Sequence, residues 1–432
     1  MSDTVRYTDM KDSGIKWIGE IPASWNVRTL YQLVTRVNNK NSDLAEQNLL
    51  SLSYGKIKRK DINAKDGLLP ASFDGYNIIE AGDIVLRLTD LQNDHTSLRV
   101  GQATERGIIT SAYTTLRPFN PEYSRYLYYL IHAFDLKKGF YGMGSGVRQG
   151  LNYNEVKELK VVIPDANEQT AITTFLDEQC GKIDSLIAEA KASVEEYKKW
   201  KQSIIFEAVT KGLNPDVEMK DSGIEWIGRI PTHWKLSSIK SLYDVTLGKM
   251  LTPKQENDSQ TLETYLCASN IKWMGVDTSV ARKMWFSEKE KSLYLLEVGD
   301  ALIMEGGSVG TSCIYTGEFS PCFIQNSVHR CRGRNGNESR FLVYWMNIVV
   351  NCGYVDSICN KATIKHYTKE KVLDTPFLVI PVNEQKLIID YLDDKCGKID
   401  SLISGKQTLL SDLETYKRSL IYETVTGKRK VV

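Results

Sequence analysis

Cys180-Gly181-Lys182-Ile183-Asp184-Ser185-Leu186-Ile187 returns without a change as residues 396–403. The two copies lie 216 positions apart, which is half of the 432-residue chain. Self-similarity at a fixed period indicates that one structural plan occurs more than once. We therefore interpret the chain as a tandem duplication, and its fold as the packing of two related halves.

Further pairs of similar segments extend the repeat in both directions. Residues 10–25 recur as residues 219–234, with Trp25 matching Trp234, and these two segments are termed the lead-ins. Residues 164–169 correspond to residues 381–385, which are one residue shorter. Between these blocks the two copies diverge, so we expect a shared fold that carries different loops.

Composition and charge exclude several classes of protein. Lys and Arg number 55 against 54 Asp and Glu, so no global basic field indicates nucleic acid, although a local patch or a basic partner can supply one. The eight Cys form no Cys-x-x-Cys pair and the five His lack metal-ligand spacing, which indicates reduced thiols and no metal site. The polar N-terminus predicts no signal peptide, and the longest apolar run, residues 341–350, is too short to span a bilayer. We expect a cytoplasmic protein.

Each half contains a lead-in, a mixed region and a long helix. Residues 49–53 and 83–88 have the composition of strands, and residues 124–131 have a helical pattern. A long helix follows over residues 167–210, with Asn167 as its expected N-cap and Gly212 at its end. The predicted domains are a lead-in, a mixed domain and a long helix, each twice, with a basic tail at the end: residues 1–25, 26–163, 164–212, 213–234, 235–380 and 381–432.

The long helices share a narrow apolar stripe, termed the seam. Steps of 4, 3, 4 and 3 give the first helix heptad spacing at Ile183, Ile187, Ala190, Val194 and Tyr197. The seam of the second helix contains Ile399, Ile403, Leu410 and Leu413. Two such helices can pack about a pseudo-twofold axis, which makes them antiparallel. The predicted fold is α+β, with two mixed α/β domains in a pseudo-twofold internal repeat, separated by an antiparallel coiled coil. The alternative is a two-domain protein with a long linker helix.

Two further expectations follow from the repeat. Gly181 lies within the first long helix, and the second copy keeps a glycine there, although helix propensity alone would not choose one. We therefore expect a close backbone approach at this position, or a break between two helices. The second lead-in directly follows the first long helix, so by symmetry the first lead-in should dock near the end of the second long helix, with the chain termini close together.

Several short segments resemble catalytic motifs, but each lacks residues or flanking structure that the motif requires. Residues 120–123, Asn-Pro-Glu-Tyr, lack the second proline of the Asn-Pro-Pro-Tyr motif of amino-methyltransferases, and the Gly-rich residues 140–146 lack a βαβ frame. Residues 305–310, Glu-Gly-Gly-Ser-Val-Gly, lack the Gly-Lys-Ser/Thr of a phosphate-binding loop. We predict no catalytic residue in this chain, which leaves recognition as its role.

Polar side chains in or beside the predicted loops are the candidate DNA contacts, because Lys and Arg neutralise phosphates while Arg, Asn, Gln and Ser bind base edges. In the first mixed region the candidates are Lys56, Lys58, Arg59, Lys60, Arg87, Arg99, Arg148 and Gln149. In the second they are Lys249, Lys254, Asn270, Lys272, Trp273, Ser308, Arg330, Arg332, Lys361, Lys365 and His366. For any single residue a solvated surface role is at least as good an interpretation, so the prediction concerns the set.

Three repeated motifs carry a family resemblance. They are Lys-Asp-Ser-Gly-Ile-x-Trp-Ile-Gly-x-Ile-Pro-x-x-Trp in both lead-ins, Asn-Glu-Gln at the start of each long helix, and Leu-Asp-x-x-Cys-Gly-Lys-Ile-Asp-Ser-Leu-Ile within each helix. Over essentially its full length the chain resembles the specificity subunits of type I restriction–modification systems. The mixed regions correspond to the two target recognition domains of that family.

The resemblance implies that each mixed domain binds one half of a bipartite, non-palindromic site on double-stranded DNA. The helix pair would set the spacing between the halves and dock two methyltransferase subunits. Those partners would bring S-adenosylmethionine and methylate adenine, and motor–nuclease subunits of the same prokaryotic complex would cleave unmodified DNA, so this chain would need no cofactor. Two alternatives remain: a stand-alone adenine methyltransferase with its own specificity domains, and a scaffold for two modules that binds no nucleic acid.

Overall fold

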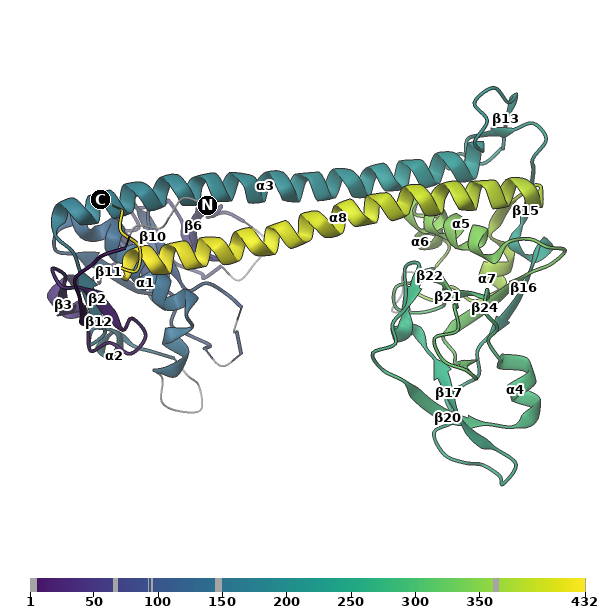
Figure 1. Ribbon diagram of the computed structural model, residues 1–432, viewed down its shortest axis with the longest axis horizontal. Helices are drawn as coiled ribbons and strands as arrows, with labels where there is room; N and C mark the ends of the chain where they lie inside the picture. Colours follow the sequence, from purple (N-terminus) through teal and green to yellow (C-terminus); the bar gives the residue numbers. More distant parts are fainter. Residues whose placement is uncertain are drawn as a thin grey trace. The chain divides into compact units, whose positions relative to one another are not determined.

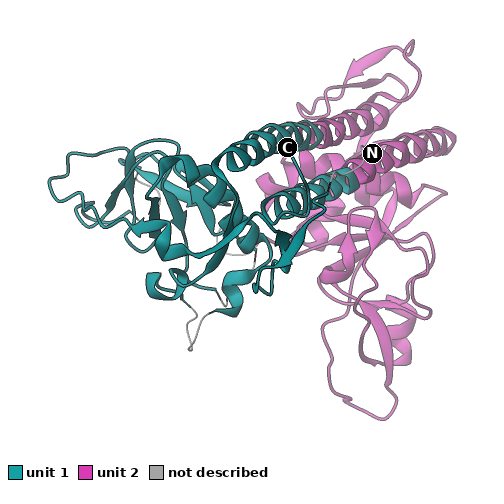
Figure 2. Cartoon of the chain, turned by 60° about the vertical axis from the view of Figure 1, so that its left-hand side comes forward, with its two compact units in different colours: residues 1–191, 407–432 teal, residues 192–406 magenta. Residues whose placement is uncertain are grey.

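The computed structural model describes residues 6–64, 69–91, 93–94, 96–143, 150–359 and 365–431. The chain forms two units, residues 1–191 with 407–432 and residues 192–406 (Figure 2). Both long helices, α3 (Ala166–Lys211) and α8 (Val382–Val425), cross the boundary between the units. The first unit contains the start of α3 and the end of α8, and the second contains the end of α3 and the start of α8. This exchange is the topology of an antiparallel pair, as predicted.

The first unit is built on a sheet with the strand order β4-β11-β8-β9, in which all neighbours are antiparallel. Helix α1 packs against β9 at one edge. The strands and short helices of this unit are β1 (Met10–Asp12), β2 (Glu20–Pro22), β3 (Asn26–Thr29), β4 (Val34–Arg36), β5 (Leu50–Ser53), β6 (Lys56–Arg59), β7 (Asn77–Ile79), β8 (Ile84–Leu86), β9 (Val100–Gln102), β10 (Gly107–Ile109), β11 (Thr114–Pro118), β12 (Lys160–Ile163), α1 (Ser124–Leu136) and α2 (Tyr153–Val156).

The second unit repeats this plan with a sheet in the order β16-β24-β21-β22, against which helix α5 packs (Figure 1). The pair β3 with β12 in the first unit corresponds to β15 with β25 in the second. The elements are β13 (Met219–Asp221), β14 (Arg229–Pro231), β15 (Lys235–Ser238), β16 (Tyr243–Leu247), β17 (Thr261–Leu266), β18 (Ile271–Lys272), β19 (Gly275–Val276), β20 (Arg282–Phe286), β21 (Ala301–Met304), β22 (Ser312–Ile314), β23 (Phe323–Ile324), β24 (Val328–Gly333), β25 (Pro376–Val379), α4 (Glu288–Tyr294), α5 (Ser339–Asn351), α6 (Tyr354–Ile358) and α7 (Lys369–Asp374).

Local predictions mostly hold, and the start of the first long helix is an exception. Strands β5 and β8 and helix α1 lie where the sequence predicts them. The predicted N-cap, Asn167, is wrong: Asp165 caps α3, because its carboxylate accepts the main-chain N–H of Glu168 at 2.9 Å. Gly212 ends α3 as expected, with a left-handed φ of 77° that favours glycine.

The seam residues lie on the inward side of both helices. Ile183, Ala190, Val194 and Ile399 are buried, and the others are half-buried: Ile187, Tyr197, Ile403, Leu410 and Leu413. Within the first unit the ammonium of Lys417 binds Asp184 at 2.6 Å, and within the second Lys201 binds Asp400 at 2.7 Å. Each pair joins the same two repeat positions with the helices exchanged. The same contact between the two helices therefore occurs within each unit, as the duplication predicts.

Neither expectation for Gly181 holds. Helix α3 is continuous through this residue, so no break separates two helices. A Cβ atom added to Gly181, or to its twin Gly397, would meet no atom within 4 Å in the part of the chain that the structure describes, its own helix backbone apart. Both glycines therefore lie on open surface, where nothing within this chain requires them.

The lead-ins dock at the ends of the long helices, as predicted. In the first unit the hydroxyl of Tyr422, near the end of α8, donates to the carbonyl of Trp17 at 3.0 Å. In the second unit Gly212, directly after α3, packs against Trp234. The ammonium of Lys430 lies 5.9 Å from the ring of Tyr7, so the two ends of the described chain are close together.

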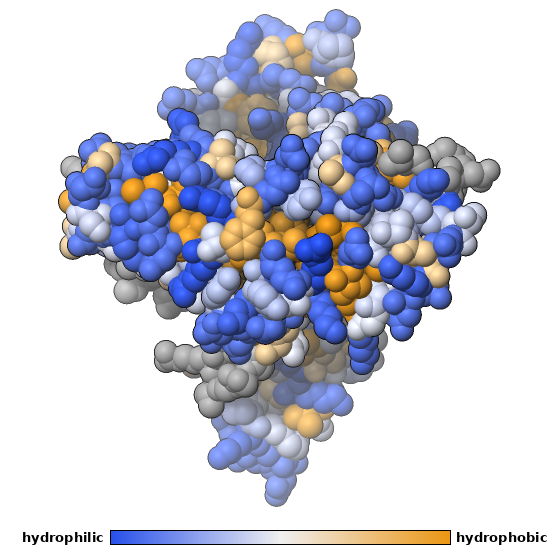
Figure 3. All heavy atoms as spheres, turned by 90° about the vertical axis from the view of Figure 1, so that its left-hand side faces the viewer, coloured by the Kyte–Doolittle hydropathy of each residue, from blue (hydrophilic) through white to orange (hydrophobic). Residues whose placement is uncertain are grey.

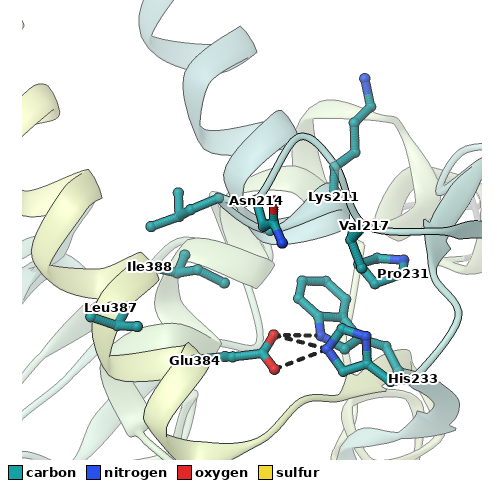
Figure 4. Close-up of a pocket in the computed structure, with 11 residues that line it drawn as sticks. Lys211, Asn214, Val217, Pro231, His233, Glu384, Leu387 and Ile388 are labelled. Atoms are coloured by element: carbon teal, nitrogen blue, oxygen red, sulfur yellow. Dashed lines mark hydrogen bonds and ion pairs between the residues drawn. The ribbon is translucent and has the colours of Figure 1, made fainter.

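A buried tryptophan holds each lead-in to the start of a long helix. The indole N–H of Trp25 donates to Glu168 at 2.8 Å, and that of Trp234 donates to Glu384 at 2.9 Å. These two carboxylates are the Glu of the repeated Asn-Glu-Gln motif. In the second unit His233 also contacts Glu384, beside a pocket of about 190 Å³ (Figure 4). The repeated residues thus have a structural role at this position.

Buried titrating groups differ between the units, which predicts different sensitivity to acid. Burial lowers the pKa of His132 in the first unit and of His329 in the second to about 4 each. A depressed histidine pKa contributes stability that is complete above pH 6.5 and is lost as the pH falls towards 4, about 3 kcal/mol per group. Burial raises the pKa of Asp135, in the first unit, to about 6. Its protonation favours the folded first unit over the same range and offsets His132, whereas in the second unit burial raises the pKa of Glu305 by less, so that Glu305 offsets His329 only in part.

We therefore expect the second unit to lose protection before the first when the pH falls from 7 to 4.5. Hydrogen exchange followed by mass spectrometry, resolved by unit, measures this directly. The substitution His329→Gln should narrow the difference, because it removes the second unit's titrating group while keeping a donor for the carbonyl of Tyr367. Equal loss of protection in both units would contradict the prediction.

Candidate nucleic-acid interface

Two twin loops project from the central sheets, one between β8 and β9 and one between β21 and β22. They occupy equivalent places, because each is held at its start by the same main-chain bond. The N–H of Leu151 donates to the carbonyl of Leu88 at 2.9 Å, and the N–H of Tyr367 donates to that of Glu305 at 2.8 Å. The position in the sheet and this main-chain bond are common to both units, while the two loops differ in length and in residues. This is the arrangement expected of two recognition surfaces on one scaffold.

Arg99 shapes the first of these loops from inside. Its side chain is fully buried, and the guanidinium donates to the carbonyls of Thr89 at 2.7 Å and Asp94 at 2.5 Å. It also donates to the hydroxyl of Tyr141 at 3.0 Å. Arg87, which is half-buried, lies 3.8 Å from the carboxylate of Asp94. The two arginines therefore fix the loop conformation. The guanidinium of Arg99 donates its hydrogen bonds to groups of the protein itself.

The second loop is a compact glycine turn. Gly307 and Gly310 have left-handed φ values of 76° and 79°. A Cβ atom on Gly310 would also lie 2.6 Å from Val350, so only glycine fits there. Ser308 is exposed at the tip of the turn. The loop is tightly closed and presents few side chains.

Many of the predicted contacts lie on the surface. Exposed residues among them are Lys56, Lys58, Arg59, Lys60, Lys254, Lys272, Trp273, Ser308, Lys365 and His366. The β5–β6 hairpin, which carries four of these, meets the first loop, since a Cβ on Gly55 would lie 3.0 Å from Leu98. Lys365 and His366 directly precede Tyr367, which binds the second loop. Each unit therefore brings basic side chains beside its own twin loop.

Several predicted contacts are instead bound within the protein. The buried ammonium of Lys249 binds Glu290 at 2.7 Å, and the buried amide of Asn270 donates to the carbonyls of two nearby loop residues. Arg330 donates to the carbonyl of Leu295 at 2.7 Å. Arg332 binds Asp300, as its twin in the first unit, Arg117, binds Asp83. Together with Arg99, these side chains support the fold, and contact with DNA would require their bonds to break.

Three predicted contacts, Arg148, Gln149 and Lys361, lie outside the described residues. Among the residues that are described, no group of His, Cys, Asp or Glu is arranged to hold a metal ion. Nor does any described helix have the length and apolar character needed to cross a membrane. The face drawn in Figure 3 is mostly hydrophilic, with separate hydrophobic patches.

The sequence interpretation missed the residues that fix each mixed domain to its long helix. Arg125 and Tyr129 on α1 both bind Asp177 on α3, and in the second unit Arg340 and Tyr344 on α5 bind their common partner, Asp393. Both carboxylates belong to the repeated Leu-Asp-x-x-Cys motif. The repeat itself could have revealed these contacts. An Asp that occurs in both copies beside the buried seam is expected to pair with a polar side chain of the neighbouring domain.

Comparisons with known proteins agree on one family. A family model described as "Type I restriction modification DNA specificity domain" matches residues 231–410. In Methanocaldococcus jannaschii, a protein provisionally named as the type I restriction enzyme MjaX specificity subunit is 22% identical over 430 residues, covering 96% of each chain. The MjaVIII specificity subunit of the same organism is 22% identical over 406 residues, covering 88% of this chain and 84% of its own.

Solved structures show the same fold. A chain from a structure of complex assembly and conformational transition of the type I R-M system has a TM-score of 0.68 at 13% identity, with 94% of this chain and 98% of that one covered. The HsdS subunit from Thermoanaerobacter tengcongensis has a TM-score of 0.51 at 14% identity, with the same coverage. The α+β architecture with two long helices is therefore a known one.

Proposed function

We propose that the chain is a specificity subunit of a type I restriction–modification system, in which each of its units recognises one half of a bipartite DNA site. The observation that carries this proposal is the pair of twin loops. They start from the same sheet position and the same main-chain bond, yet one is shaped by Arg99 and the other by glycines. Two related frames with different loops would contact two different base sequences, so the site would be asymmetric.

The helix pair is proposed to dock two copies of one partner. In the eight-residue identity, packing accounts for the buried residues, but four positions are exposed in both copies: Gly181, Lys182, Ser185 and Leu186, and their twins Gly397, Lys398, Ser401 and Leu402. No contact within the described chain explains the two open glycines. Two identical exposed patches on pseudo-symmetric helices suit two copies of the same subunit. We infer that these are methyltransferase subunits, one for each unit.

The chemistry is assigned to those partners. We propose that the methyltransferase subunits bring S-adenosylmethionine and methylate adenine, and that motor–nuclease subunits join the same complex. A stand-alone methyltransferase remains the alternative, and binding of S-adenosylmethionine by the isolated chain would support it. A scaffold that binds no nucleic acid would be indicated by loss of all DNA retention at low salt with the partner present, because phosphate contacts are strongest there.

Methylation-sensitive single-molecule sequencing tests the proposed function. DNA from a host that carries this chain with its cognate methyltransferase is compared with DNA from a host that lacks only this chain. We expect a new bipartite motif with methylated adenine, which identifies both half-sites and the spacer. No new motif, with a methyltransferase known to be active beside another specificity subunit, would contradict the proposal.

The docking patches make a separate prediction about assembly. Leu402 is 47% exposed, so Leu402→Glu should change the stability of the chain by less than about 0.5 kcal/mol. It should nevertheless place a charge in one docking surface, so that the complex retains one methyltransferase subunit instead of two. Native mass spectrometry of the assembled complex measures this ratio.

The matched control is Leu409→Glu. Leu409 is similarly exposed on the same helix, at 44%, but its repeat position holds Ser193, so it lies outside the repeated patch. This variant should retain both partners. Retention of both partners by Leu402→Glu as well would show that the repeated patch is not the docking surface.

A further inference from the structure

Glu305 is a largely buried carboxylate that accepts no hydrogen bond from the residues that the structure describes. It directly follows β21 and is 8% exposed. Among the described residues no hydrogen bond or ion pair reaches its side chain, while its main-chain N–H and carbonyl are both bound, to Ser327 and Tyr367. Burial raises the pKa of this carboxyl above its usual value, and the nearby imidazole of His366 opposes that rise without bonding to the carboxylate. Its oxygens still reach solvent, since neither is among the fully enclosed polar atoms that lack a partner.

The fold does not require a carboxylate at this position. The repeat twin of Glu305 is Leu88, which is 2% exposed and packs in the core of the first unit. The main-chain bond from Tyr367 to Glu305 has its counterpart in the bond from Leu151 to Leu88. An apolar side chain therefore suits the same backbone position. Burying a carboxylate without a partner costs free energy, so its presence in one copy only indicates a role outside the fold.

The backbone that carries the side chain is also held in place. The loop that begins at Glu305 closes on itself, with the N–H of Gly310 donating to the carbonyl of Met304 at 2.9 Å. On the other side, His329 bonds to the carbonyl of Tyr367 at 2.8 Å and so fixes the segment that binds Glu305. The carboxylate is therefore presented on a rigid frame, which lowers the entropy lost when a ligand binds.

We propose that Glu305 determines specificity by accepting a hydrogen bond from the exocyclic amino group of one base in the half-site of the second unit. This rests on the proposed function. An ionised carboxylate only accepts hydrogen bonds and is repelled by phosphates, so it suits a base edge and not the DNA backbone. In the major groove the exocyclic donors are the N4 amino group of cytosine and the N6 amino group of adenine. Either donor would satisfy the carboxylate that the protein leaves unpaired.

The test compares the methylated motif of the full complex with that of two variants. Glu305→Gln keeps the shape of the side chain and replaces one acceptor by a donor, and Glu305→Leu restores the residue of the twin. We expect discrimination at a single position of the second half-site to fall by about 5- to 150-fold, the range for one base-edge contact. The identity of the relaxed base distinguishes cytosine from adenine.

The first half-site and the spacer are internal controls and should not change. Glu288→Gln, which removes an exposed carboxylate from α4 in the same unit, should leave the whole motif unchanged. An unchanged motif in both Glu305 variants would overturn the proposal, as would relaxation at every position of the second half-site, which would indicate a role in loop shape only. Loss of all methylation by the near-isosteric Glu305→Gln would also overturn it, because one contact carries only part of the affinity. If the unaltered chain yields no bipartite motif, the proposed function itself fails.

Discussion

Replacing Trp234 by alanine is expected to destabilise the second unit by about 3–5 kcal/mol, the cost of deleting a buried indole. The side chain is fully buried and belongs to the same hydrophobic core as Ile205 and Val209 of α3 and Ile230 of the lead-in. Its N–H also binds Glu384. Removing it leaves a cavity at the point where the lead-in meets both long helices, and leaves His233 as the remaining partner of the Glu384 carboxylate. Chemical unfolding, combined with hydrogen exchange resolved by unit, measures the effect.

Two further variants separate the causes. Trp234→Phe keeps most of the apolar contact and loses the hydrogen bond, so about 1–3 kcal/mol is expected, the value of a bond to a charged group. Trp200→Ala removes an indole that is 52% exposed in the same unit and should cost less than about 0.5 kcal/mol. In Trp25→Ala the loss of protection should move to the first unit. A uniform loss over both units in Trp234→Ala would show that the two units do not unfold separately.

Inserting one heptad into both long helices is expected to lengthen the accepted DNA spacer by about three base pairs. Seven helical residues add about 10.5 Å, and one base pair occupies about 3.4 Å along the DNA axis. The insertions belong after Lys191 on α3 and after Lys406 on α8, where the two units meet in the sequence. A heptad preserves the seam, because the apolar stripe repeats every seven residues. Neither half-site should change. The sequence of the methylated motif gives both half-sites and the length of the spacer.

An insertion of the same seven residues after Leu213 is the control. This position lies beyond the end of α3, and Trp234 anchors the following lead-in independently of the link, so the spacer should stay the same. An unchanged spacer in the helix variant, with the complex intact, would show that the helix pair does not set the spacing.

The helix pair is the part of the fold that the sequence predicted best. Its seam depends on a period of three and four residues, which is local and visible in the sequence itself. The duplication then supplied the antiparallel arrangement, because two related helices on one chain can bury their seams by symmetry. The predicted N-cap, Asn167, lies two residues from the observed one, Asp165. Several polar residues near the start of a helix can cap that helix, and the main-chain geometry selects one of them. The repeated Gly181 was interpreted as an internal feature, whereas it lies on open surface.

The candidate interface could be predicted only as a set. Lys249, Arg99 and Arg330 have the same sequence character as exposed basic residues, but each is buried with internal partners. The residue with the clearest unpaired chemistry, Glu305, was considered only as part of an incomplete phosphate-binding motif. No local pattern could separate these cases, because the partner of each side chain comes from a distant strand or loop.

By itself the sequence determined the duplication, the two long helices with their seams, and the family to which the repeated motifs point. These properties depend on periodicity and on identity between copies, both of which are linear. Only the tertiary structure decided which basic side chains remain on the surface, which carboxylates anchor the lead-ins, and that no residue in the described part of the chain donates a hydrogen bond to Glu305. The reason is physical: whether a charged group is free depends on the groups that folding brings within hydrogen-bonding distance, and most of these are far away in the chain.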